Sequence, residues 1–135
     1  MGNVQKKFEC SFDLIPKSSL QMRQEAIEAA RQTAVRVLEK ALGKAGFHFK
    51  IRRQPFHVIR ENPLASGAGA DRMSTGMQKS FGKPMGLVLR IKAGQELMTV
   101  SVDSANIKTA KKALKRAASK LACRFSIKMT ENKAA

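Results

Sequence analysis

The sequence lacks several features that would point to particular kinds of protein. It has no tryptophan, no tyrosine and only two cysteines, Cys10 and Cys123, neither of them in a Cys-x-x-Cys pair. We therefore expect two small, half-buried thiols in a reducing compartment. No apolar run approaches the roughly 18 residues that a membrane span needs, and the N-terminus has no apolar signal core. These absences predict a cytoplasmic protein with no membrane partner.

Acidic residues are also few. The chain has 26 Lys and Arg against 10 Asp and Glu, which gives a formal net charge of +16. A charge of this size makes the compact state repel itself, and nucleic acid is the commonest partner that neutralises it. Because the chain has neither Trp nor Tyr, it lacks the aromatic pair typical of sheets that bind single strands. We expect a protein that reads folded RNA through shape and backbone.

The hydrophobic pattern predicts an α+β fold in a single domain over residues 1–135. We expect a two-layer sandwich, in which a mainly antiparallel sheet carries two helices on one face and a long Gly-rich loop lies at the centre. The ordered core should cover about residues 8–129, with a frayed tail over 130–135. Helices are predicted over 18–46, ending at Gly43 or Gly46, and over 104–121. Strands are predicted over 8–14, 47–53, 56–60 and 124–129, and residues 85–102 read as a hairpin that turns at residues 93–95.

Residues 61–84 form a stretch too long for an ordinary connection. Five of the nine glycines fall between Gly67 and Gly86. Loops of this length are usually functional or disordered, and glycine allows backbone to approach a phosphate closely. Two nucleotide-binding motifs fail here, because Arg72 stands where GxGxxG needs its third glycine and Pro84 replaces the Ser or Thr of a Walker loop. We expect a flexible loop that contacts RNA.

No catalytic constellation is visible. His48 and His57 flank a short turn between two predicted strands, but no Cys, Asp or Glu accompanies them at metal-ligand spacing. Ser74, Thr75 and Ser80 have no nearby base in the sequence. We therefore expect no enzyme, no metal or other cofactor and no small-molecule substrate, and the histidines suit a structural or RNA-facing role.

Basic side chains on and beside the predicted sheet are candidate RNA contacts, because arginine can fork onto phosphate and stack on bases. The strip comprises Lys50, Arg52, Arg53, Arg60, Arg90 and Lys92, with His48 and His57 beside it. Phe81 is the one aromatic residue of the loop and is a candidate for base stacking. The second predicted helix carries a further stripe of lysines, which reads equally well as a solvated face or as an RNA contact: Lys108, Lys111, Lys112, Lys115 and Lys120.

Several stretches together form a signature that extends over about residues 8–129. They are "EAIEAAR" (25–31), "GFHFKIRRQPFHVIREN" (46–62), "GAGADRMSTGM" (67–77) and "FGKPMG" (81–86), continued by "RIKAGQELMTV" and "AKKALKRAASKL". In these stretches the chain resembles the L-ten-e family of archaeal and eukaryotic large-subunit ribosomal proteins, whose bacterial counterpart is L-sixteen. Such a long run is far more specific than any single motif within it.

The resemblance implies two helices against a sheet and a seat on large-subunit rRNA, as a monomer beside neighbouring ribosomal proteins. The long loop would reach towards tRNA and the peptidyl transferase centre, and would support tRNA positioning. The implied rRNA or tRNA contacts are His57, Arg60, Asn62, Arg72 and Lys83, with Lys44 and Lys79 as further basic candidates. Family members usually begin with a basic N-terminal arm, which we expect to be absent here. The alternative is a basic RNA- or DNA-binding protein that acts outside the ribosome.

Overall fold

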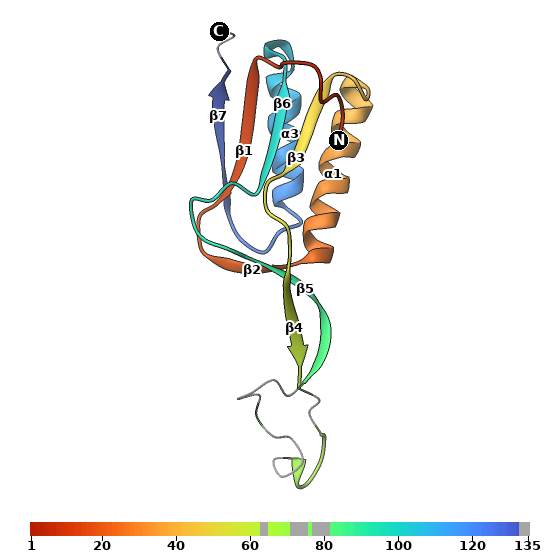
Figure 1. Cartoon of the computed structure of the whole chain (residues 1–135), viewed down its shortest axis with the longest axis vertical. Helices are drawn as coiled ribbons and strands as arrows, with labels where there is room; N and C mark the ends of the chain where they lie inside the picture. The colour runs from red at the N-terminus through yellow and green to blue at the C-terminus, as the bar shows by residue number, and fades with distance from the viewer. Residues whose placement is uncertain (63–64, 71–75, 77–81, 133–135) are drawn as a thin grey trace.

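The computed structural model describes residues 1–62, 65–70, 76 and 82–132. A body of sheet and helices continues into a narrow two-stranded arm (Figure 1). In chain order the elements are β1 (Cys10–Pro16), β2 (Leu20–Arg23), α1 (Gln24–Leu42), β3 (Phe47–Ile51), β4 (His57–Glu61), β5 (Lys83–Ile91), β6 (Met98–Val102), a short 3-10 turn (Ser104–Asn106), α3 (Ile107–Ala118) and β7 (Phe125–Glu131).

The body is built on a four-stranded antiparallel sheet in the order β3-β6-β1-β7. Because side chains alternate along a strand, one face is apolar and packs against the helices. Its fully buried members include Phe12, Leu14, Phe47, Met98, Val100 and Val102. The other face is polar, since the register sets Asp13 beside Thr99 and Thr99 beside Lys50. The helices therefore cover one face and leave the polar face open to partners (Figure 1).

Helix α1 ends where the sequence predicts but begins later. Gly43, with φ 69°, terminates it, and its N–H donates to the Glu39 carbonyl oxygen. The residues expected to form its first turn are instead strand β2, which pairs with β5 and buries Met22. The Ser19 hydroxyl, just before β2, accepts from the Ala93 N–H. Pairing between distant strands thus outweighs the local helical pattern.

The predicted hairpin over residues 85–102 is wrong. β5 pairs with β2 and β4 in a separate three-stranded antiparallel sheet, whereas β6 pairs with β1 and β3. The connection between them is tied to β1, because the Gly94 N–H donates to the Pro16 carbonyl and the Leu97 N–H to that of Leu14. The α+β class is confirmed, with α1 and α3 as the helices of the described residues and the strands divided between two sheets rather than gathered in one.

The arm consists of β4 and β5, which pair from His57–Val88 to Glu61–Lys83 with an irregularity at Ile59/Arg60. β5 therefore begins inside the stretch that was expected to be loop. Of the remaining residues between the two strands, the structure describes 62, 65–70, 76 and 82. At the other end of the chain β7 continues to Glu131, and the Asn132 N–H donates to the Glu9 carbonyl. Ordered structure therefore extends past Met129.

Candidate nucleic-acid interface

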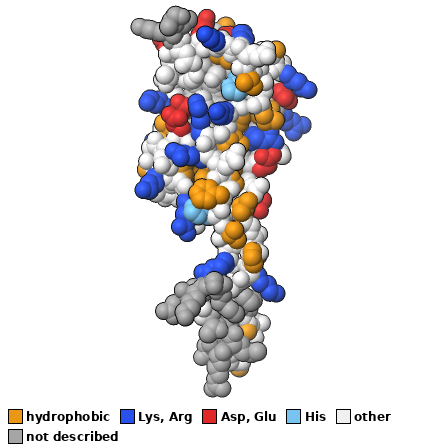
Figure 2. All heavy atoms as spheres, in the orientation of Figure 1, with side chains coloured by type: hydrophobic (Ala, Val, Ile, Leu, Met, Phe, Trp, Pro, Cys, Tyr) orange, Lys and Arg blue, Asp and Glu red, His pale blue; other side chains and the backbone are white. Residues whose placement is uncertain are grey.

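A hollow of about 890 Å³ lies where β3 ends beside β2 and β5. We call it the basic basin. Five of the predicted RNA contacts line it: Lys50, Arg52, Arg53, Arg90 and Lys92. The other lining residues in the described part of the chain include no carboxylate. In Figure 2, Lys and Arg side chains lie around exposed apolar side chains where the body meets the arm. Such a basin suits a chain of phosphates, because nothing in its lining repels them.

Arg52 is held in the basin by a buried polar pair. Thr99 is 3% exposed and Asp13 is 7% exposed. The Thr99 hydroxyl donates to the Asp13 carboxylate at 2.6 Å and accepts from Arg52 Nε at 2.8 Å. The Arg52 backbone N–H also donates to the Leu97 carbonyl. Because this network uses Nε, it fixes the side chain while the two terminal nitrogens remain the groups that would meet a phosphate.

Replacing Thr99 with valine should show how much this network contributes to the stability of the fold. The Asp13 carboxylate would lose its buried donor and Arg52 its anchor, so we expect the free energy of unfolding in urea to fall by about 1–3 kcal/mol. Thr130→Val is the matched control, because Thr130 is an exposed residue of β7 beside Ser11. Equal, small effects of the two substitutions would show that the network contributes little.

The two histidines do not form a pair. β3 and β4, which carry His48 and His57, belong to different sheets, and Figure 2 shows two separate imidazoles. Burial lowers the pKa of His48, and the positive charges of the N-terminus, Lys50 and Arg52 lower it further. His48 is therefore neutral at pH 7 and would meet RNA as a hydrogen-bonding group rather than as a cation.

The arm brings a second set of predicted contacts next to the basin. His57, Arg60 and Arg90 line a hollow of about 230 Å³ along β4 and β5. Arg90 also lines the basin, so the two hollows adjoin at its side chain. Lys83 is exposed at the start of β5, and Asn62 is half-buried just after β4. These residues form a basic path from the basin along the arm.

An apolar ridge on the arm was not anticipated as part of the site. Phe56 is 73% and Val58 is 58% exposed, and Met85 and Leu87 are also exposed. Val58 and Leu87 are direct cross-strand partners, and the Phe56 ring lies 4.3 Å from the His57 ring, centroid to centroid. The alternation of Phe56 and Val58 was visible in the sequence. Their exposure was not, because it depends on how far the arm lies from the body. Exposed apolar patches of this kind mark interaction surfaces.

Four further predicted contacts are not among the residues placed at the basin or along the arm. Lys44 is exposed in the turn between α1 and β3, at the end of the body away from the arm (Figure 1). The structure therefore does not bring it to the basin. Arg72, Lys79 and Phe81 lie outside the described residues, so they stay predictions.

Two further kinds of site were sought in the described residues. They contain no group of three or more His, Cys, Asp or Glu side chains placed to hold a metal ion. None of the helices over the described ranges has the length and apolar character to cross a membrane.

An α+β body with a carboxylate-free basin of five cations has the features of a protein that binds nucleic acid. Comparison with known families agrees, since the family model described as ribosomal protein L16p/L10e matches residues 1–128. The chain belongs to this family; it is a ribosomal protein and not an enzyme.

Individual relatives agree over most of the chain. The large ribosomal subunit protein uL16 of Methanocella arvoryzae is 43% identical over 121 residues, which are 90% of this chain and 70% of that protein. Its counterpart from Archaeoglobus fulgidus is 41% identical over the same shares. The protein of the same name from Methanococcus maripaludis is 38% identical over 98% of this chain and 77% of its own length.

Proposed function

We propose that this protein is a structural component of the large ribosomal subunit and that it binds rRNA through the basic basin. The observation that carries the proposal is the convergence of Lys50, Arg52, Arg53, Arg90 and Lys92 on one hollow without a carboxylate. Family membership supplies the setting, and the relatives are named as large-subunit proteins. Phosphate contacts supply most of the affinity of such a protein and fix its orientation on RNA.

The arm would extend this contact away from the body. It is narrow, it projects from the body (Figure 1), and it carries the basic path of His57, Arg60 and Lys83 beside the apolar ridge. A protein seated by its basin would therefore present the arm to whatever lies beyond its own rRNA site. We propose that the arm lies near the tRNA sites and the peptidyl transferase centre, where it supports tRNA positioning.

A variant of the arm tests the proposed role in tRNA positioning. Cells would carry Arg60→Ser with Lys83→Ser as the sole copy, and purified large subunits would be joined to small subunits for filter-binding measurements with tRNA. We expect the variant to enter large subunits at the normal level, since its basin is intact. Losing two charged contacts of about 1.5 kcal/mol each should weaken tRNA binding by a factor of about one hundred.

Lys17→Ser with Lys128→Ser is the control for this experiment, because both side chains are exposed and neither lines the basin or the arm hollow. Subunits with the control variant should bind tRNA normally. Normal tRNA binding by the arm variant would remove the tRNA role. Recovery of the wild-type protein only at the top of a sucrose gradient would favour a role outside the ribosome.

A further inference from the structure

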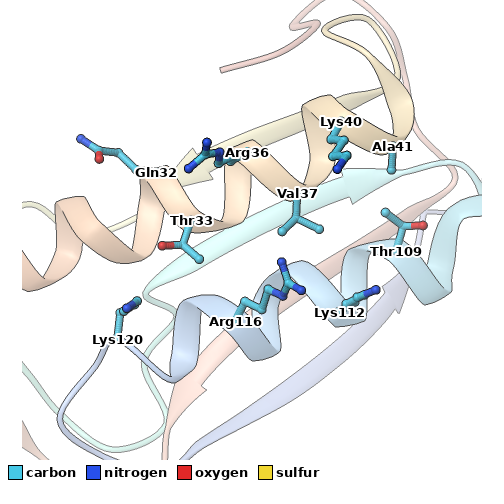
Figure 3. A pocket seen from close by; sticks show the side chains of 10 residues that line it. All are labelled: Gln32, Thr33, Arg36, Val37, Lys40, Ala41, Thr109, Lys112, Arg116 and Lys120. Carbon is cyan, nitrogen blue, oxygen red and sulfur yellow. The ribbon is translucent and has the colours of Figure 1, made fainter.

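A groove of about 980 Å³ runs between α1 and α3 on the helix side of the body (Figure 3). Its lining residues repeat every four positions along both helices. On α1 one row is Gln32, Arg36 and Lys40, and the next is Thr33, Val37 and Ala41; on α3 and just beyond it the row is Lys112, Arg116 and Lys120, with Thr109 before it. Small or apolar side chains thus form the floor, and long basic side chains form both walls.

The packing of the helices explains why the two walls lie close together. The buried positions of both helices are rich in alanine: Ala30 and Ala34 on α1, and Ala110, Ala113 and Ala117 on α3, are fully buried. Small side chains at a helix contact allow the axes to approach towards the lower end of the usual range of about 8–10 Å. The charged rows that flank the contact are brought together as a consequence.

The charge in the groove is of one sign. Of the lining residues, Arg36, Lys40, Lys112, Arg116 and Lys120 are cations and none is acidic. Glu28 does not line the groove, but its carboxylate accepts a hydrogen bond from the side chain of Gln32, which does. Arg31 pairs with that carboxylate and lowers its pKa to about 2, so its charge is already neutralised. The ion pairs found among the described residues otherwise join Lys6 to Asp103, outside the groove.

This arrangement opposes the stability of α3. Like charges four residues apart on a helix destabilise it by about 0.2–0.5 kcal/mol per pair, and α3 holds one such pair in the groove, Lys112–Arg116. Two more pairs, Lys108–Lys112 and Lys111–Lys115, involve lysines beside the groove that do not line it. The helix has no acidic residue in its sequence to offset them. A helix face that contacted only solvent would be more stable with charges of both signs. The row of cations on α3 therefore indicates a bound polyanion.

We infer that the α1/α3 groove is a second RNA-binding site. It would bind a phosphate backbone on the face of the body opposite the polar face of the sheet. A rise of 1.5 Å per residue separates successive cations in a row by about 6 Å. Two such lines of charge fit a linear polyanion rather than a single phosphate. This inference rests on the proposed function and extends it: the protein would bridge two stretches of rRNA, one in the basin and one between the helices.

The test compares four forms of the full chain for binding to a fluorescently labelled RNA duplex across a range of salt concentrations. They are the wild type, a groove variant (Lys112→Gln, Arg116→Gln, Lys120→Gln), a basin variant (Arg53→Gln, Arg90→Gln, Lys92→Gln) and a control with the same loss of charge (Lys17→Gln, Arg124→Gln, Lys128→Gln). Each neutralised phosphate contributes about 0.9 to the slope of log affinity against log salt. The groove variant should therefore lose about 2–3 units of slope relative to the control, and the effects of groove and basin variants should add.

The outcomes separate this inference from the proposed function. Binding by the groove variant that equals the control would overturn the inference while leaving the basin untouched. A groove effect without a basin effect would retain the inference and remove the proposed rRNA site. Glutamine keeps a good helix propensity, so the groove variant should melt at or above the wild-type temperature. A lower melting temperature would show that these cations stabilise the fold, which contradicts an RNA-binding groove. Normal duplex binding by a groove variant that fails to enter large subunits would indicate a protein partner, which also contradicts it.

Discussion

Replacing Arg52, Arg53 and Arg90 with glutamine is expected to lower the affinity of the protein for large-subunit rRNA by about 100- to 1000-fold. The three side chains line one basin whose lining includes no carboxylate, so each would lose a charge-assisted contact to phosphate. The salt dependence should weaken at the same time, by roughly 0.9 in slope per lost contact. Filter binding of the purified variant to rRNA at several salt concentrations measures both quantities.

Two controls isolate the basin as the cause of this loss. Lys17→Gln with Arg124→Gln and Lys128→Gln removes the same charge from exposed positions outside the basin, and should reduce affinity only slightly. Arg53→Gln with Arg90→Gln leaves the hydrogen bond from Arg52 to Thr99 intact, so it separates RNA contact from any change in folding. Equal losses in the basin variant and the charge-matched control would mean that only net charge matters.

Phe12→Ala should cause the largest loss of stability among single substitutions in the body. Phe12 is fully buried on β1, between β6 and β7, and faces the helices. Its removal leaves a cavity and is expected to lower the free energy of unfolding by about 3–5 kcal/mol. Since domains are stable by only about 5–15 kcal/mol, the variant should be close to unfolded at moderate urea concentrations, as followed by circular dichroism.

Ile15→Ala on the same strand provides the comparison for the core. Ile15 is half-buried and lies on the other face of β1, so its loss should cost no more than about 1–2 kcal/mol of unfolding free energy. If the two variants unfolded at the same urea concentration, the helix-facing side of the sheet would not be the core on which the fold depends.

Local pattern was sufficient for the elements whose burial repeats along the chain. The spacing of Ile27, Ala30, Ala34 and Leu38 predicted α1, Gly43 predicted its end, and the alternation of Phe47 and Phe49 predicted β3. Each of these signals comes from residues that are close in sequence. The basic strip was predicted from the basic side chains on and beside the expected strands, and the structure brings five of its members into one basin.

Features set by distant pairing could not be predicted in this way. The short β2 strand forms because it pairs with β5. The residues around the turn at Gly94 give no sign that β5 pairs with β2 and β4 rather than with β6. The bond between Thr99 and Asp13 joins residues 86 positions apart, so the anchoring of Arg52 has no local signature. The groove depends on the approach of α1 to α3, which the lysine stripe alone does not reveal.

Ultraviolet cross-linking of native large subunits, followed by mass spectrometry of the peptides attached to RNA, tests the central claim most directly. The account predicts rRNA adducts on the peptides that contain residues 50–56 and 88–92, which meet in the basin. Peptides from the outer strand β7, away from the basin, should carry few adducts. Adducts confined to β7 or the C-terminal residues, with none around the basin, would contradict rRNA binding through this surface.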